Sequence, residues 1–150
     1  MIVHCDNGQK YGILSGMNAH PDVPASTVRI ALMCENPAVY RSLGPRLSVD
    51  RQFVVVGTFD CTLDYVAEVA ATCPDVIILG ISRITHFNMM VCQAIKPRCP
   101  DAAIIALPSY IDQTDEVRAA REAGADSVML KSIDTPALVQ QIHTLVELKS

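Results

Sequence analysis

The chain has 150 residues, of which 50% are hydrophobic and 19% are charged, and its mean hydropathy is +0.27. A chain of this length and composition can bury a core as one domain, which excludes intrinsic disorder. Its 12 basic and 16 acidic residues leave a net charge of −4, and without a block of basic residues the chain is a poor binder of nucleic acid on its own.

Cysteine usage and the first residues indicate the cellular compartment. The sequence contains six cysteines and no CxxC pair, so it lacks the zinc-ribbon and thioredoxin-type motifs. Most of the cysteines lie in or beside apolar runs, which predicts reduced, buried thiols. The first residues lack the basic and long apolar regions of a signal peptide, so we expect none, and no apolar run is long enough to span a membrane. We expect a soluble cytoplasmic chain without metal or cofactor.

Residues 1–27 differ from the rest of the chain, because they are rich in glycine and proline and show little hydrophobic periodicity. This composition predicts an irregular N-terminal extension, with folding back onto the domain as the alternative. The regular pattern begins at Val28, so we expect the folded domain to cover residues 28–150.

Beyond this extension, short apolar runs alternate with segments whose apolar residues recur at helical spacing. Asn36 and Pro37 suit the N-cap and first turn of the first helix, and Pro45 is expected to kink or shorten that helix. Thr135 as N-cap and Pro136 in the first turn suit the start of the last helix. The predicted strands cover 28–33, 53–57, 76–79, 103–107 and 127–130, and the predicted helices cover 37 to about 47, 63–71, 88–95, 114–123 and the segment from 135.

Five strands that alternate with five helices predict βαβ units with right-handed crossovers. The run 76–79 consists of four branched apolar residues, which fits a strand that is buried on both faces. We therefore predict an α/β fold, a three-layer (βα)5 sandwich of the flavodoxin-like type whose parallel five-stranded sheet has the order 2-1-3-4-5. Functional groups of such sheets lie beyond the carboxyl ends of the strands. The loops at that edge begin at Cys34, Gly80, Pro108 and Lys131.

Four segments carry a family resemblance. Residues 32–37 read Leu-Met-Cys-Glu-Asn-Pro, and residues 74–80 read Pro-Asp-Val-Ile-Ile-Leu-Gly. The other two are Val-Val-Gly at 55–57 and Gly-Ala-Asp-Ser-Val-Met-Leu-Lys at 124–131. In order and separation these segments resemble the receiver domains of bacterial response regulators, especially the receivers that precede LuxR-type DNA-binding domains. The resemblance covers about residues 28–148.

The resemblance implies phosphoryl transfer from a histidine kinase to an aspartate, assisted by two further acids that hold Mg²⁺, a hydroxyl and a lysine. At the acceptor position this chain has Gly80, which offers no carboxylate. Cys34 stands at the position of the first acid, and a thiol is a poor ligand for Mg²⁺. Glu35 stands at the position of the second acid, and Lys131 at that of the lysine.

Two further positions of the resemblance are ambiguous or altered. The hydroxyl position falls on Pro108 when it is counted from Gly80, and on Ser109 when it is counted back from Lys131. Val128 stands in place of the aromatic switch residue three positions before the lysine. With these departures, the resemblance implies a degenerate pseudo-receiver that keeps the fold, has lost phosphorylation and its readout, and is not an enzyme.

The resemblance also implies how such a domain acts. We expect protein–protein contacts, in particular a homodimer through the fourth helix, fifth strand and fifth helix, or through the first and fifth helices. A DNA-binding domain, fused in a longer chain or supplied by a partner, would place the protein in transcriptional regulation. This chain by itself is not expected to bind nucleic acid or a membrane.

The alternative is a sensor that uses the space around Gly80. Replacement of an aspartate by glycine would open a pocket beside Cys34 and Lys131, and a small ligand would fill it. A neighbouring ammonium group would also lower the pKa of the Cys34 thiol and favour a redox switch.

Overall fold

The structure is a computed structural model that describes residues 27–149. The predicted extension over residues 1–27 lies outside these described residues, apart from Thr27.

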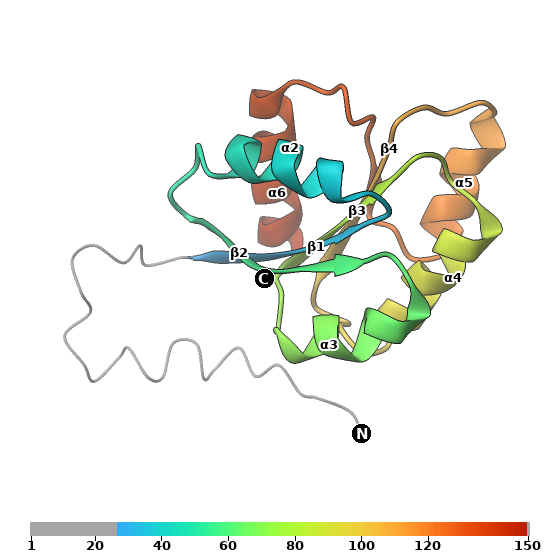
Figure 1. Cartoon of the computed structure of the whole chain (residues 1–150), viewed down its shortest axis with the longest axis horizontal. Helices are drawn as coiled ribbons and strands as arrows, with labels where there is room; N and C mark the ends of the chain where they lie inside the picture. Colours follow the sequence, from blue (N-terminus) through green and yellow to red (C-terminus); the bar gives the residue numbers. More distant parts are fainter. Residues whose placement is uncertain (1–26, 150) are drawn as a thin grey trace.

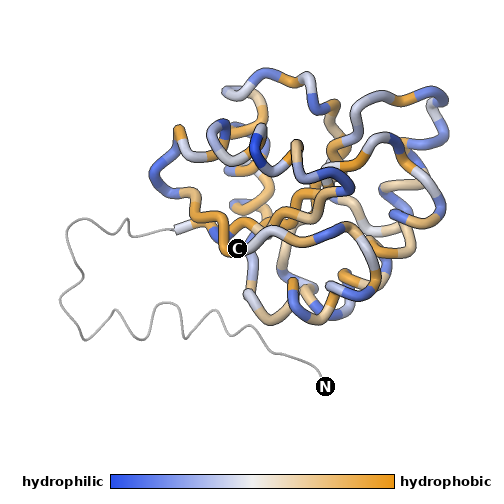
Figure 2. The backbone as a smooth tube through the Cα atoms, in the orientation of Figure 1, coloured by the Kyte–Doolittle hydropathy of each residue, from blue (hydrophilic) through white to orange (hydrophobic). Residues whose placement is uncertain are grey.

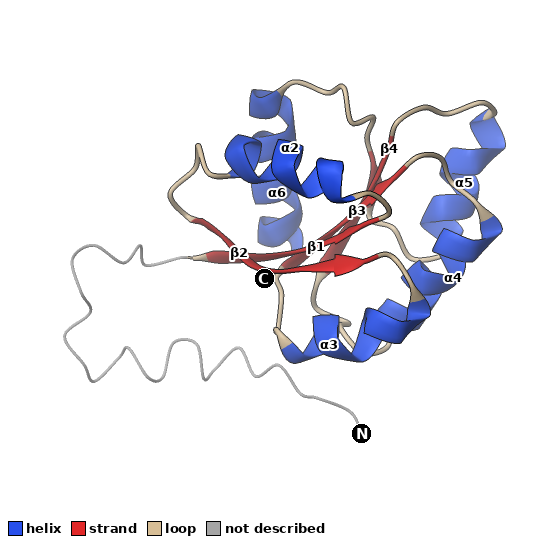
Figure 3. Ribbon diagram, in the orientation of Figure 1, coloured by secondary structure: helices blue, strands red, loops and turns tan. Residues whose placement is uncertain are grey.

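Five parallel strands form one sheet in the order β2-β1-β3-β4-β5 (Figure 3). They are β1 (Val28–Cys34), β2 (Phe53–Asp60), β3 (Val76–Ile81), β4 (Ala103–Pro108) and β5 (Ser127–Val128). The predicted strand order is confirmed. Every residue of β3 and β4 is buried, as expected of parallel strands that helices cover on both faces.

Helices lie on both faces of the sheet and give a three-layer architecture (Figure 1). They are α2 (Pro37–Leu47), η1 (Leu63–Tyr65), α3 (Val66–Ala71), α4 (His86–Ile95), α5 (Thr114–Glu122) and α6 (Thr135–Lys149). One core lies under α2 and α6, and the other lies under α3, α4 and α5. Figure 2 shows hydrophobic residues gathered along the central strands between these two layers.

The alternation of side chains along β1 assigns its residues to the two cores. Ala31 and Met33 belong to the core under α3, α4 and α5. Ile30, Leu32 and Cys34 belong to the core under α2 and α6. Since successive strand residues point to opposite faces, Cys34 at the end of β1 is directed toward the α2 layer.

The first helix starts as the sequence predicts. The Asn36 side chain accepts a hydrogen bond from the Ala38 N–H at 2.9 Å, and Pro37 occupies the first turn. Pro45 lies inside α2, and the helix ends at Leu47, two residues later. The start of α2 is therefore set locally, directly after the carboxyl end of β1.

Two other helices start at different residues from those predicted. Thr85 and Asn88 form a reciprocal capping box, so α4 begins at His86 instead of residue 88. At α6 the Asp134 carboxylate accepts the Ala137 N–H at 2.8 Å. The N-cap is therefore Asp134 and not Thr135, which is already helical.

Strand lengths also depart from the sequence pattern. β2 continues to Asp60, because it keeps pairing with β1 as far as the Cys34–Asp60 pair. β5 contains only Ser127 and Val128. The chain nevertheless stays beside β4, since the Lys131 N–H donates to the Pro108 carbonyl at 2.9 Å. This bond brings Lys131 to the carboxyl edge of the sheet.

The described cysteines are free thiols, of which Cys34, Cys61, Cys92 and Cys99 are buried and Cys73 is half-buried. Their placement confirms the prediction of buried thiols. Within residues 27–149, no helix has the length and apolar character needed to cross a membrane.

Candidate functional site

The carboxyl ends of β1 and β3 meet at the sheet edge where the resemblance places its chemistry. Cys34 is the last residue of β1 and pairs with Gly80 of β3. The Glu35 N–H donates a hydrogen bond to the Gly80 carbonyl oxygen at 3.0 Å. Cys34 and Gly80 are buried, whereas Glu35 is exposed. The structure thus brings these three predicted site residues together.

Two side chains cover the backbone at Gly80. A Cβ atom at residue 80 would lie 2.8 Å from Val39 Cγ1 and 3.0 Å from Cys34 Sγ. Val39 lies in the first turn of α2, and as a β-branched residue in a helix it has little rotamer freedom. The expectation of an open space at Gly80 is therefore wrong, because Val39 and Cys34 occupy the place of a side chain there.

Glu35 is the one carboxylate among the predicted site residues. Its Oε1 accepts a hydrogen bond from the Ser82 N–H at 2.6 Å, which joins the turn after β1 to the loop after β3. Mg²⁺ requires several hard oxygen ligands. Within residues 27–149, no cluster of three or more His, Cys, Asp or Glu side chains is arranged to hold a metal ion. The residues present do not fit the Mg²⁺ site that the resemblance implies.

Lys131 faces a hydroxyl at the same edge. Its Nζ donates a hydrogen bond to Ser109 Oγ at 3.0 Å. Pro108 is the buried last residue of β4 and carries no hydroxyl, so the geometry favours Ser109 for the hydroxyl position. Loss of hydration lowers the pKa of Lys131, and the neighbouring Glu35 carboxylate opposes this effect.

Arg46 was missed by the sequence reasoning, although it contacts the segment that carries Lys131. Its guanidinium donates to the carbonyl oxygen of Lys131 at 3.0 Å, to the carbonyl oxygen of Ile133, and to Thr135 Oγ1 at 3.0 Å. These bonds fasten the loop between β5 and α6 to the last turn of α2. Only the basic character of that last turn could have suggested such an anchor, since an arginine at a helix C-terminus is common.

A pocket of about 320 Å³ opens beside this edge. Its polar lining includes Arg46, Ser82, Ser109 and Lys131, and Val39 also contributes. Neither Gly80 nor Cys34 lines it. The cavity therefore lies on the α2 side of the predicted position and is separated from the Gly80 backbone, which Val39 and Cys34 cover.

The Cys34 thiol is less readily ionised than the sequence suggested. Burial raises the pKa of Cys34 to about 11, and the opposing effects of the Gly80 backbone and the Lys131 charge are smaller. The side chain is 1% exposed. The expectation that Lys131 lowers the pKa of this thiol enough to favour a thiolate is wrong, because desolvation outweighs the attraction of one half-buried ammonium group.

The predicted switch position and the neighbouring loop are also held in place. Val128 is half-buried and packs against the core under α3, α4 and α5. In the loop after β3, Arg83 pairs with Asp112 at 3.2 Å and lies 5.8 Å from the centre of the Tyr110 ring. Arg83 thereby joins the loop that precedes α4 to the loop that precedes α5.

A curated relative and several solved structures that are similar to this chain are all response regulators or receiver domains. No protein-family model matches the chain. It is similar to a nitrate/nitrite response regulator protein homolog from Haemophilus influenzae, with 23% identity over 120 residues. The matched region covers 80% of this chain and 57% of that relative, so the chain spans a little over half of the relative's length.

Solved structures place the fold among receivers. The signal receiver domain of the response regulator NarL from Mycobacterium tuberculosis superposes with a TM-score of 0.70 at 21% identity, over 81% of this chain and 98% of that one. A LuxR-family two-component response regulator from Aurantimonas sp. SI85-9A1 superposes with a TM-score of 0.65 at 24% identity, over 81% of this chain and 86% of that one. The isolated REC domain of RcsB from Salmonella enterica serovar Typhimurium superposes with a TM-score of 0.69 at 16% identity, over 81% of this chain and 90% of that one. The chain has the fold of a response-regulator receiver domain.

The packing at Gly80 predicts a specific mutational pattern. Gly80→Ala should destabilise the chain by about 1–3 kcal/mol, because the added Cβ overlaps Val39 and Cys34. Adding Val39→Ala should recover much of that loss, so the two changes should couple by at least about 0.5 kcal/mol. Urea unfolding of the parent chain, both single variants and the double variant measures this coupling.

Gly44→Ala serves as the matched control, since nothing lies within 4 Å of a Cβ at residue 44. Gly44 lies inside α2, so alanine there should stabilise the chain by about 0.5–1 kcal/mol. Strict additivity of Gly80→Ala and Val39→Ala would contradict the contact between the two residues.

The raised pKa of Cys34 predicts slow alkylation. A change from the ordinary value of 9.0 to about 11 lowers the thiolate fraction at neutral pH about a hundredfold. Iodoacetamide should therefore modify Cys34 far more slowly than half-buried Cys73, with a rate that rises up to about pH 11. Peptide mapping by mass spectrometry measures both rates, and urea-unfolded chain provides the reference. Rapid Cys34 alkylation at pH 7 in the folded chain would contradict this prediction.

Proposed function

We propose that this chain is a receiver-like signalling domain of the NarL/LuxR type that accepts no phosphoryl group at the usual position and acts through protein contacts. It would work in the cytoplasm within a transcription regulator, and its DNA-binding domain would lie in a longer chain or in a partner. In this proposal the chain is not an enzyme and does not itself bind nucleic acid. The receiver fold and the similarity to a nitrate/nitrite response regulator support the assignment.

The observation that carries the proposal is the contact of Val39 and Cys34 over Gly80. An acyl phosphate needs a carboxylate at that point, and residue 80 has none. The two side chains that cover the backbone also leave no room for one to be restored by a single substitution. Glu35 is the one carboxylate at this position, and its Oε1 already accepts the Ser82 N–H. A single carboxylate does not supply enough oxygen ligands for a Mg²⁺ site.

Two arginine anchors support a module that works without a phosphoryl group. Arg46 fastens the loop that carries Lys131, and Arg83 fastens the loop before α5. In each case a cation of the chain itself holds a loop at the carboxyl edge. A domain built in this way would present the same surface to its partners at all times.

The proposed self-contact uses α6, which belongs to both candidate dimer faces. One face consists of α5, β5 and α6, and the other consists of α2 and α6. Leu130 after β5 is 40% exposed, and Leu148 on α6 is 75% exposed. Val139 and Val146 of the same helix pack against the core, so the apolar surface available to a partner on α6 centres on Leu148.

The first test is phosphoryl labelling with acetyl phosphate and Mg²⁺, read by intact-mass spectrometry. The parent chain should gain no phosphoryl group. The variant that combines Gly80→Asp, Cys34→Asp and Val39→Ala should gain one, because it restores two carboxylates and removes the covering side chain.

The matched control replaces Gly80→Asp by Gly80→Asn in the same triple variant, since an amide forms no acyl phosphate. Circular dichroism and urea unfolding establish that both triple variants are folded. Stoichiometric labelling of the parent chain would overturn the proposal, and an unlabelled, folded Gly80→Asp triple variant would contradict the assignment of position 80.

The second test is sedimentation equilibrium over a concentration series, with reductant and after mild oxidation. We expect a dimer in both conditions, because the cysteines of the core are buried. Leu148→Glu should weaken it about tenfold or more, as expected for a charge placed in an apolar contact. Leu63→Glu is the control, since Leu63 is 43% exposed and lies on η1, outside both faces. A monomer at every concentration, or a dimer that depends on oxidation, would contradict the expected contact.

A ligand-sensing function is the second candidate, and the pocket beside Lys131 favours it. Two cationic side chains, Arg46 and Lys131, and the hydroxyls of Ser82 and Ser109 line the same cavity. This lining suits an anionic small molecule that carries a phosphate or carboxylate group. The ligand site in this proposal is the pocket in front of Val39, not the backbone at Gly80.

Thermal unfolding with pyrophosphate at constant ionic strength tests this candidate. Saturation at a hundred times Kd should add about 2.7 kcal/mol to the free energy of unfolding and raise Tm. Lys131→Ala should abolish the rise. Arg41→Ala, which removes an exposed charge from α2 outside the pocket, should keep it. An equal rise in Tm for the parent and the Lys131→Ala variant would exclude this site.

A further inference from the structure

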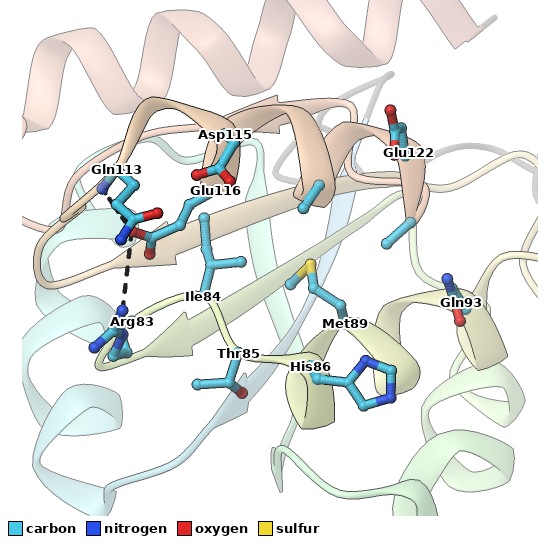
Figure 4. A pocket seen from close by; sticks show the side chains of 12 residues that line it. Arg83, Ile84, Thr85, His86, Met89, Gln93, Gln113, Asp115, Glu116 and Glu122 are labelled. Carbon is cyan, nitrogen blue, oxygen red and sulfur yellow. Dashed lines mark hydrogen bonds and ion pairs between the residues drawn. The ribbon is translucent and has the colours of Figure 1, made fainter.

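A second cleft lies between α4 and α5, away from the edge that carries Lys131. It has a volume of about 460 Å³ and is lined by both helices and by the loop before α4 (Figure 4). It contains none of the predicted site residues. Neither of the two dimer faces proposed above includes α4, although α5 belongs to one of them.

The bottom of this cleft is apolar. Ile84 and Met89 lie between the two helices and are 6% and 7% exposed (Figure 4). Ala119 and Ala123 of the α5 side line the opposite wall with small side chains. The floor of the cleft is therefore apolar, and burial of apolar groups against it would favour binding.

The α5 wall is acidic. Asp115, Glu116 and Glu122 all line the cleft from this side. Arg83 is the nearest basic lining residue, and it is engaged at one end of the cleft, with Asp112 at 3.2 Å and Glu116 at 3.9 Å. Asp115 and Glu122 remain exposed, so the α5 wall presents negative charge to a ligand.

Glu116 adds an unsatisfied acceptor to this wall. Its Oε2 accepts the N–H groups of Gln113 at 2.7 Å and Asp112 at 3.0 Å. Its Oε1 is buried and has no hydrogen-bond partner among the described residues. A buried carboxylate oxygen without a partner is costly, and a cationic donor that enters the cleft would remove this cost.

The α4 wall carries no acidic residue. Its lining residues are His86, Met89 and Gln93. The cleft thus has an apolar floor at Ile84 and Met89 and one acidic wall on the α5 side. An amphipathic helix that carries apolar residues on one stripe and Arg or Lys on the next would match this floor and this wall.

We propose that the cleft between α4 and α5 is the docking site for an amphipathic basic helix of a partner protein. The partner helix lies along the groove, with apolar side chains over Ile84 and Met89 and basic side chains toward Asp115 and Glu122. One arginine or lysine reaches Glu116. The inference rests on the proposed function only in that both concern protein contacts. It uses no residue of the phosphorylation site, and of the dimer faces it uses only the side of α5 that lines the cleft.

The probe is a pair of peptides of about 18 residues, long enough for an amphipathic helix. One has Leu on one face and Arg on the other, and the second has Glu in place of every Arg. We expect the Arg peptide to bind and to shift the amide NMR signals of Met89, Ala119 and Glu122 in ¹⁵N-labelled full chain. The Glu peptide should not bind. Binding of both peptides alike, or shifts confined to other surfaces, would overturn the proposal.

Charge reversal on α5 tests whether the acidic wall of the cleft binds the Arg peptide. Asp115→Lys with Glu122→Lys should weaken binding of the Arg peptide at least about tenfold in fluorescence anisotropy. Asp64→Lys with Glu68→Lys makes the same change in charge at exposed positions on η1 and α3, and should change the affinity less than about twofold. Equal losses in both pairs would mean general attraction to an acidic chain and would overturn the proposal.

The outcomes separate this inference from the proposed function. Phosphoryl labelling of the parent chain would overturn the function and leave peptide binding at the cleft unaffected. If instead Asp115→Lys with Glu122→Lys abolished self-association and the Arg peptide did not bind, the occupant would be a second copy, which would contradict a basic partner.

Discussion

The structure depends on the complete burial of β3 between β1 and β4. Each residue of this strand is buried, and each buried Val, Ile or Leu side chain contributes about 1.5–3 kcal/mol to folding. Helices must cover both faces to achieve this burial, which requires crossover connections and makes the sheet parallel. Parallel strands in turn collect the carboxyl ends of β1, β3 and β4 at one edge, and the site residues are found there.

Packing at that edge decides the chemistry of the site. Gly80 lets Val39 and Cys34 approach the β3 backbone more closely than any other residue would allow. The same contact buries Cys34, and burial raises the pKa of its thiol to about 11. A glycine at this point thus has two consequences, since it offers no carboxylate and lets neighbouring side chains close over the backbone. The cavity that remains lies farther out, beside Lys131.

Arginines make the long-range connections around this edge. Arg46 reaches across to the loop after β5, and Arg83 joins the loops before α4 and α5. A guanidinium group suits this task because it offers several donors in a fixed plane. The two loops that border the site are consequently held from outside, and the acidic wall of the α4–α5 cleft remains available because Arg83 engages only one end of it.

Local patterns in the sequence determined the fold class, the five-stranded order and most element positions, because hydrophobic periodicity, caps and glycine or proline stops depend on neighbouring residues. They also determined that position 80 has no carboxylate. Only the tertiary structure decided that Ser109 faces Lys131, that Val39 covers Gly80, and that the Cys34 thiol is not activated. The Arg46 bond to Lys131 joins residues 85 positions apart. Such contacts depend on how helices pack over the sheet, and burial, which sets both the space at Gly80 and the pKa of Cys34, is a property of that packing.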